Sequence, residues 1–478
     1  MGIEAAGIVT LGLGLLALRL GSGFALAAFV PLTLLGAAAA VLLGGSGTIQ
    51  PAHLMLGFAV PAAWRALDRD GLRTSLRFPN EGFWLVAFTV TTTLGAILLP
   101  RLLAGATAIN AIGSTDYGPS LMLVPLGPTS GNLTQSIYGI ADLVCFLLCA
   151  ALAGRPQGYR LLARALTSYC ALNIGFALLD LATYWTNTAF LFGPVRNADY
   201  HLHTETVVTG LKRIVGSFTE TASFAYATLG ALGFSAELWL AGVRPRLFAP
   251  LALMSLLLLT LSTSSTAYVA TPLLLAALLA RLGLRATQRR ITLTGAAVLL
   301  LVPVLMAALL TGVLLVPAAR DAVADTLTAL LFDKAGSQSG LERAQWNIDA
   351  LRNAIDTAGF GAGLGSVRAS SFPVALLANT GVPGTLLFSG FLVRLLLTTA
   401  APDRGAVAAI RDAARLACLG LLLGATVSGA MVDLGLPFFI FAALASARVR
   451  PALATTPAIA RRVAIASPWR VPAETRAA

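Results

Sequence analysis

The chain has 478 residues, of which 57% are hydrophobic and only 11% are charged, and its formal net charge is +12. A soluble protein carries roughly a quarter charged residues, so this composition excludes an ordinary soluble globular protein. Apolar runs recur along the whole length and are unbroken rather than alternating, which indicates helices rather than a barrel. We therefore expect an all-α, polytopic integral membrane protein.

The excess positive charge does not indicate nucleic-acid binding, because no basic stripe interleaves with aromatic residues. The four cysteines lie within apolar runs, without a CxxC motif or a Cys/His cluster. The sequence therefore predicts neither a disulfide framework nor a zinc site, and we expect no cofactor and no metal.

In chain order, single apolar runs predict spans near 5–20, 23–43, 51–64, 82–104, 134–153, 163–185, 220–240, 291–315 and 372–396. Two longer stretches, 248–281 and 413–447, are interrupted by "TLSTSSTAY" and "VSGAMVDLGLP", and each predicts a pair of short helices. Together these runs predict about 11–13 transmembrane helices.

Most arginines fall in short segments on one side of these spans, near 65–77, 155–164, 244–246, 281–290 and 404–415. The positive-inside rule makes that side cytoplasmic. The tail 448–478 belongs there as well, and we expect it to be disordered.

The other side holds three longer loops, 105–133, 186–219 and 316–371. The last two loops contain basic residues against the topological bias, namely Arg196, Lys212, Arg213, Arg320, Arg343, Arg352 and Arg368. Topology does not explain basic residues on this side of the membrane, and anion binding is the natural explanation for them.

One candidate stretch is "GLKRIVGSFTETASFAYATL", residues 210–229. Lys212 and Arg213 end the second outer loop, and Glu220 begins a span, so cations and a carboxylate are expected at the outer membrane surface. The alternative is that Arg213 only anchors a helix end by snorkelling.

The loop 316–371 holds the second group of candidates. Residues 340–357 predict an amphipathic helix whose shared apolar face is formed by Leu341, Trp346, Ile348, Leu351 and Ile355, with Arg343 and Arg352 pointing elsewhere. A glycine-rich run follows, in which the backbone can approach a ligand closely; it contains Gly359, Gly361, Gly363 and Gly365 and leads to Ser366 and Arg368. A flexible connector is the alternative, and no GxxxxGK[ST] motif supports a nucleotide P-loop.

Three sequence segments follow one another along the chain: "RIVGSFTE", a short "LLLLTLS" helix that turns back, and "ER…W…AL…GFGAGLGS…LLANTGVPG". In this order and spacing they resemble the O-antigen ligase and polymerase superfamily, over about residues 205–395. The resemblance divides the chain into N-terminal transmembrane helices (1–200), a ligase/polymerase-like region (201–447) with a periplasmic loop (316–371), and the tail.

The resemblance implies a glycosyltransferase of the bacterial inner membrane with its active site facing the periplasm. Such proteins transfer a glycan from undecaprenyl pyrophosphate to an acceptor sugar by an inverting, metal-independent reaction in cell-envelope or exopolysaccharide synthesis. The implied partners are the lipid-linked oligosaccharide, the acceptor glycan and the bilayer, with a flippase and a chain-length regulator.

By motif position, Arg213 is the arginine expected to contact pyrophosphate, and Arg343 is the second catalytic candidate. Planar guanidinium forks suit phosphate oxygens, and the outer face has no DxD-like pair. Glu220 is expected either to orient Arg213 or to act as general base. The expected substrate-binding residues are Lys212, Trp346, Arg352, Gly363, Gly365, Ser366 and Arg368.

The sequence departs from the family pattern at two points, and the second, a missing loop histidine, favours a polymerase of repeat units over a ligase that joins polymer to lipid A core. The helix-pair turn reads Ser262-Thr263-Ser264-Ser265 where family members carry Ser-Arg, and no histidine lies within 316–371. His201 and His203, in the earlier outer loop, remain candidates for acid–base work.

The alternative from another class is a multi-span transporter or flippase of lipid-linked sugars, which should show an internal repeat or polar groups at mid-membrane. Asp142 and Asp180 fall inside or near the ends of spans, where ionisable groups are often functional. Asp433 lies at the turn of the last helix pair and is expected to face an arginine of the site. Tyr268 and Trp346 are candidates to stack on sugar rings.

Overall fold

The computed structural model describes residues 2–44, 47–115, 118–119, 123–198, 207–208, 211–328, 337–397 and 405–449. Most of this part of the chain is helical, and the strands are short. Within it, six helices are long and apolar enough to cross a membrane: α5 (Glu81–Leu102), α6 (Ser130–Ala153), α7 (Pro156–Trp185), α10 (Ser265–Thr287), α11 (Leu293–Leu315) and α15 (Phe372–Leu397). The expected all-helical class with membrane-spanning segments is confirmed at this level.

The remaining helices are shorter or less apolar. They are α1 (Ala5–Leu20), α2 (Ser22–Leu32), α3 (Pro51–Ala63), α4 (Arg69–Ser75), α8 (Thr221–Leu240), α9 (Pro245–Leu261), α12 (Pro317–Leu327), α14 (Gln338–Asp356), α16 (Ala406–Ser428) and α17 (Gly435–Ser446), with 3₁₀ turns η1 (Trp64–Ala66) and η2 (Ala189–Val195). Both expected helix pairs are present, as α9 with α10 and α16 with α17, although α10 is long enough to span alone.

The expected span 23–43 is wrong beyond Leu32, where α2 ends. The following segment makes tertiary hydrogen bonds in place of helical ones: Ala37 donates its N–H to Ser217 O, and Ser217 Oγ donates to Leu34 O at 2.7 Å. The chain then enters a three-stranded antiparallel sheet of β1 (Gly2–Ile3), β2 (Val41–Gly44) and β3 (Gly47–Ile49), in that order.

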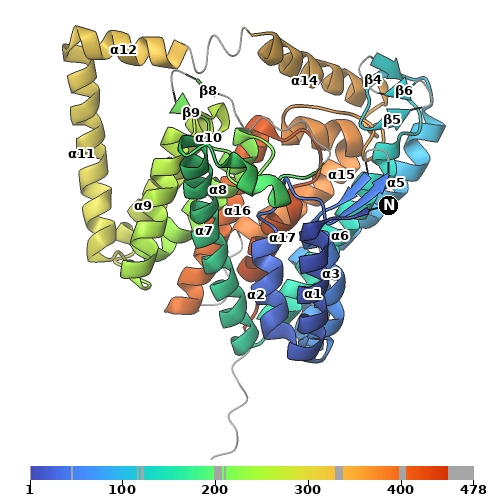
Figure 1. Ribbon diagram of the computed structural model, residues 1–478, viewed down its shortest axis with the longest axis horizontal. Coiled ribbons are helices and arrows are strands. Elements are labelled where there is room, and N and C mark those ends of the chain that lie inside the picture. The colour runs from blue at the N-terminus through green and yellow to red at the C-terminus, as the bar shows by residue number, and fades with distance from the viewer. Residues whose placement is uncertain are drawn as a thin grey trace, which may run out of the picture.

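Long connections gather at one end of the bundle, which we call the loop end. Figure 1 shows α12, α14 and the hairpin of β8 (Val207–Val208) and β9 (Leu211–Lys212) at the top of the view. Two other small antiparallel pairs lie there too: β4 (Ala108–Asn110) with β7 (Leu123–Pro125), and β5 (Ser114–Thr115) with β6 (Gly118–Pro119). Because successive helices alternate in direction, the short arginine-bearing connections fall at the opposite end, as expected.

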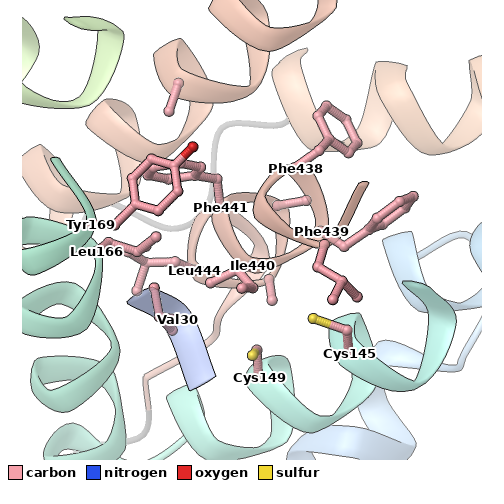
Figure 2. Packing of buried hydrophobic residues seen from close by; sticks show 14 of the residues in the cluster. Val30, Cys145, Cys149, Leu166, Tyr169, Phe438, Phe439, Ile440, Phe441 and Leu444 are labelled. Atoms are coloured by element: carbon pink, nitrogen blue, oxygen red, sulfur yellow. The ribbon is translucent and has the colours of Figure 1, made fainter. Parts of the chain in front are cut away.

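Helix α17 forms the centre of the core. Phe438 and Phe441 are fully buried, and the ring of Phe441 meets that of Tyr169 from α7 edge to face, with centroids 5.9 Å apart. Figure 2 shows Cys145 and Cys149 of α6 on the other side of the same helix. Helix α11 is the opposite case, because none of its membrane-crossing window is buried against the protein. An apolar helix exposed all round is suited to lipid.

Candidate functional site

The loop that carries Arg213 is fixed by Asp180, near the end of α7. Lys212 Nζ and Arg196 Nη2 each lie 2.6 Å from Asp180 Oδ1, and the N–H groups of Val215 and Gly216 donate to Oδ2 at 2.9 and 3.1 Å. The side chains of Asp180 and Lys212 are only 1% and 3% exposed. Lys212 is therefore committed to an internal ion pair and does not face a ligand, contrary to the sequence-based expectation.

Arg213 is the next residue after Lys212, and its side chain lies in a different environment. Its side chain is half-buried, and its Nε has no hydrogen-bond partner among the residues that the structure describes. Burial lowers the pKa of the Arg213 guanidinium, the nearby Glu220 carboxylate opposes this shift, and the positive charge of Arg343 adds to it. An arginine starts from so high a pKa that it stays charged, so Arg213 is a cation beside a second cation.

Arg368 joins them from the loop that follows the glycine run. Its guanidinium carbon lies 4.2 Å from the centroid of the Trp346 ring. Burial lowers the pKa of Arg368, and Arg343 and Glu220 act on it in opposite directions, as they do on Arg213. The structure thus brings together four of the predicted residues, which we call the arginine cluster: Arg213, Arg343, Arg368 and Glu220.

Some arginines at the opposite end of the bundle, Arg281 and Arg285 among them, are paired with carboxylates instead. Arg281 Nη2 lies 3.3 Å from Glu237 Oε1 and 2.8 Å from Asp412 Oδ2, and Arg285 pairs with the same two carboxylates. The three arginines of the cluster form no ion pair with another residue in the described ranges. This contrast leaves the cluster with unused capacity to bind an anion.

Helix α14 is held in one rotational setting by hydrogen bonds to β4. Asn110 Nδ2 donates to Asp349 Oδ2 at 3.0 Å, and Asn353 Nδ2 donates to Thr107 Oγ1 at 2.9 Å and to Ala108 O at 2.7 Å. These bonds turn the helix so that Trp346 lies beneath Arg368.

The prediction that Trp346 shares one apolar face of α14 with four other residues is therefore wrong. The other four residues of that face are exposed, namely Leu341, Ile348, Leu351 and Ile355. Arg352 follows Arg343 by nine positions, or two and a half turns at 3.6 residues per turn, so it lies on the opposite side of the helix and is exposed. The structure does not bring Arg352 into the cluster.

The glycine run packs against protein rather than facing a ligand. Gly363 and Gly365 are buried with φ values of 97° and 82°. A Cβ on Gly365 would lie 2.2 Å from Gly131 O, and one on Gly363 would lie 2.7 Å from Pro100 Cδ. Ser366 is fully buried, and its Oγ donates to Ala362 O at 2.9 Å. These three residues serve close backbone packing on α5 and α6, which corrects the expectation that they contact substrate.

The loop before Arg368 is tied to α15 by Asn379. Val367 N–H donates to Asn379 Oδ1 at 2.9 Å, and Asn379 Nδ2 donates to Val367 O at 2.8 Å. Two residues later the helix breaks at Gly381, where φ is 63°. The buried Asn379 therefore holds the loop before Arg368 next to the break in α15, a role that the resemblance of the motif did not predict.

A cavity of about 280 Å³ adjoins the cluster, and Glu220 lines it. Its polar wall consists of Gln50, His53, Ser223, Ser428 and Asp433, and its aromatic wall of Tyr169, Phe218 and Tyr226. Asp433 also lines a smaller cavity of about 30 Å³ that reaches Asp142 and Gln135. Glu220 therefore lies where the arginine cluster and a mixed polar and aromatic cavity meet.

Two carboxyl groups come together beside this cavity. Asp142, near the middle of α6, and Asp433, in the turn between α16 and α17, line the same smaller cavity. Asp433 forms no ion pair with another residue in the described ranges, so the expectation that it pairs with an arginine is wrong. Sequence reasoning noted both aspartates but could not place residues almost three hundred positions apart in one cavity.

The other candidates lie outside this site. Tyr268 donates its hydroxyl to Thr260 O at 2.9 Å, at the turn between α9 and α10. His201 and His203 fall outside the described residues. Within the described ranges, no three His, Cys, Asp or Glu side chains come together in a group that could hold a metal ion.

Comparison of the chain with models of protein families, with curated proteins and with solved structures finds no match. The chemistry of the arginine cluster and its cavity is therefore the basis for assigning a function.

Proposed function

We propose that the protein is a membrane glycosyltransferase that transfers a glycan from undecaprenyl pyrophosphate to a hydroxyl group of an acceptor sugar. Within that class, a polymerase of lipid-linked repeat units at the periplasmic face of a bacterial inner membrane is the reading we favour. The absence of a histidine from residues 316–371 supports polymerase over ligase. The resemblance of the sequence motifs provides the substrate class.

The observation that carries the proposal is the convergence of three arginines without ion-pair partners at the loop end. Arg213 comes from the β9–α8 connection, Arg343 from α14 and Arg368 from the loop after it. A pyrophosphate leaving group develops negative charge as the glycosidic bond breaks, and partly buried guanidinium groups stabilise such charge better than solvated ones. Arg213 and Arg343 are half-buried, whereas Arg368 is exposed. Glu220 balances part of the positive charge before the donor binds.

The cavity beside the cluster supports the second half of the reaction. Aromatic rings next to carboxylates and hydroxyl groups are typical of sites that bind sugar rings. Because Glu220 lines the cavity and also acts electrostatically on Arg213 and Arg368, an acceptor held there would lie next to a donor held by the arginines.

A transporter of lipid-linked sugars is the second candidate, and one observation favours it. Asp142 lies near the middle of a membrane-crossing helix and lines a small cavity together with a second carboxyl group, as in proton-coupled carriers. The arginine cluster, however, lies at one end of the bundle rather than at its middle.

Reconstitution of the purified protein in liposomes tests the proposal. Pyrophosphate-linked glycolipids extracted from source-cell membranes are supplied in the presence of EDTA, and products are separated by gel electrophoresis. We expect a ladder of longer glycans and release of undecaprenyl pyrophosphate. Arg213→Ala should form no ladder, whereas Arg320→Ala, at an exposed arginine of α12, should. Movement of glycolipid across the bilayer with no change in glycan length would favour the transporter.

A further inference from the structure

Two turns touch each other at the end of the bundle opposite the loop end. One joins α8 to α9, and the other joins α10 to α11. Thr292 Oγ1 donates to Leu240 O at 2.6 Å, and a Cβ on Gly242 would lie 3.6 Å from Thr292 Cγ2. We call residues 241–246 and 288–292 the arginine turns, because each carries two arginines: Arg244 and Arg246 in the first, and Arg289 and Arg290 in the second.

The positive charge of the arginine turns is not balanced by the protein. All four arginines are exposed, and none forms an ion pair with another residue in the described ranges. The chain has no Asp or Glu between Glu237 and Asp321. Glu237 is already bound by Arg281 and Arg285. The arginine turns therefore present four unpaired guanidinium groups to whatever lies outside them.

The backbone adds to this preference for an anion. Helix α9 begins at Pro245 and α11 at Leu293, so each arginine turn leads directly into a helix N-terminus. The first N–H groups of a helix have no partner within the helix, and the aligned peptide dipoles give this end a partial positive charge. Two helix N-termini and four arginines at one place thus favour the same kind of ligand.

The helices that begin at these turns have apolar surfaces. None of the membrane-crossing window of α11 is buried against the protein, and Figure 1 shows α11 at the left edge of the molecule, beyond α9. Helix α9 exposes Leu253, Leu257 and Leu261 by 53%, 48% and 43%. The arginine turns therefore lie where an apolar surface meets water, which is the depth of the lipid headgroups. A free phosphate ion would make no use of these apolar surfaces, whereas a phospholipid would use both parts.

We propose that the arginine turns bind the headgroup of an anionic phospholipid whose acyl chains lie along α9 and α11. Guanidinium forks bind phosphate oxygens through parallel hydrogen bonds. A zwitterionic headgroup carries its own cation, which the arginines repel, so a lipid with a net negative charge is selected. The bound lipid would also hold α11 to the bundle, because Gly295 is the only buried residue of that helix. The site lies away from the arginine cluster and does not depend on the proposed glycosyl transfer.

The test measures binding of phosphatidylglycerol with a fluorescent acyl chain to the purified protein in detergent, with phosphatidylcholine as the reference lipid. Arg244 and Arg289 have φ values of 42° and 53°, so the variant changes the other two arginines and leaves that backbone intact. Each arginine near a lipid surface is worth about fivefold in affinity, so Arg246→Gln/Arg290→Gln should bind phosphatidylglycerol about 30-fold more weakly. Its affinity for phosphatidylcholine should not change.

The matched control is Arg160→Gln/Arg164→Gln, which removes two exposed arginines of α7 at the same end of the bundle. This control should lower the affinity for phosphatidylglycerol by less than about threefold. An equal loss in both double variants would mean that surface charge alone attracts the lipid, and would overturn the site. If the double variant does not fold, each single variant should still show its fivefold loss, and unchanged affinity in both would overturn the site as well.

Two further measurements identify the ligand as a lipid. Glycerol phosphate, which has the anionic headgroup without acyl chains, should not displace the labelled phosphatidylglycerol at equal concentration. Displacement as effective as that by unlabelled lipid would assign the arginine turns to a soluble anion instead. Phosphatidylglycerol should also raise the unfolding temperature of the wild-type protein more than that of Arg246→Gln/Arg290→Gln. An equal rise in both proteins would contradict the role in holding α11.

Discussion

The guanidinium group of Arg368 lies over the indole ring of Trp346, 4.2 Å from its centroid. A cation–π contact of this kind contributes about 0.5–2 kcal/mol. It also restricts Arg368 to one direction beside Arg213 and Arg343. The contact therefore joins α14 to the loop after the glycine run at the point where we expect the donor phosphates.

Replacing Trp346 should weaken donor binding. We expect Trp346→Ala to reduce the affinity for undecaprenyl pyrophosphate by about 3- to 30-fold, and Trp346→Phe to lie between alanine and wild type. The matched control is Trp64→Ala, which removes a similar contact with Arg69 at the opposite end of the bundle, 5.8 Å from ring centroid to guanidinium. Equal affinity in both alanine variants would separate Trp346 from the donor site.

Arg213 should require its planar group and not only its charge. Losing one charge-assisted contact in a partly desolvated site costs about 2–4 kcal/mol, or roughly 30- to 1000-fold in rate. Arg213→Ala should abolish long polymer while lipid-linked single repeat units accumulate, and Arg213→Lys should be partly defective. Polymer length is measured at matched protein level, with Arg320→Lys as control. Wild-type chain length in Arg213→Ala would remove this residue from the site.

Lys212 and Asp180 should affect stability rather than substrate affinity. Breaking a buried ion pair by removing one partner costs about 3–5 kcal/mol. Asp180→Asn should be the more damaging change, because it leaves both Lys212 and Arg196 without their carboxylate, whereas Lys212→Met leaves the Arg196 pair in place. Thermal unfolding in detergent measures this order. A Lys212→Met protein of normal stability but weakened donor binding would restore Lys212 to the substrate site.

Gly365 should tolerate no side chain. A Cβ there would lie 2.2 Å from Gly131 O, and a positive φ adds about 1–2 kcal/mol of strain for alanine. Gly365→Ala should therefore lower the free energy of unfolding by more than this amount. Gly175→Ala in α7 meets nothing within 4 Å and should be neutral or stabilising by up to about 1 kcal/mol. Equal stability of the two variants would contradict the packing of the glycine run.

Cysteine labelling can test the two ends of the bundle. The natural cysteines are all buried, so a membrane-impermeant maleimide should react mainly with an introduced thiol. We expect Ser339→Cys, on α14, to be labelled in intact spheroplasts, and Gln288→Cys, after α10, to be labelled only after lysis. The reverse pattern would place the arginine cluster on the cytoplasmic side and exclude a periplasmic reaction.

Sequence alone predicted most of the helical framework, because unbroken apolar runs such as 82–104 and 372–396 have few alternatives to a spanning helix. It failed at 33–43, where an equally apolar segment bonds to the loop around Ser217 instead. Hydropathy measures the preference of a segment for a nonpolar environment. It cannot distinguish lipid from the interior of the same protein.

Sequence also placed Arg213, Arg343, Arg368 and Glu220 in one site, because all four lie on loops of the same side. It could not separate them from Lys212 and Arg352. Lys212 differs from Arg213 only by its access to Asp180, and Arg352 differs from Arg343 by the rotation of α14. Both distinctions depend on tertiary contacts. The cavity shared by Asp142 and Asp433 was missed for the same reason.

Asp180 binds two segments of the chain. One is held through Arg196, and the other through Lys212 and the N–H groups of Val215 and Gly216. The two ends of the connection from Arg196 to Lys212 are thus fixed to the same carboxylate. A change in the length of this connection should therefore leave both ends, and with them Arg213, in the same position.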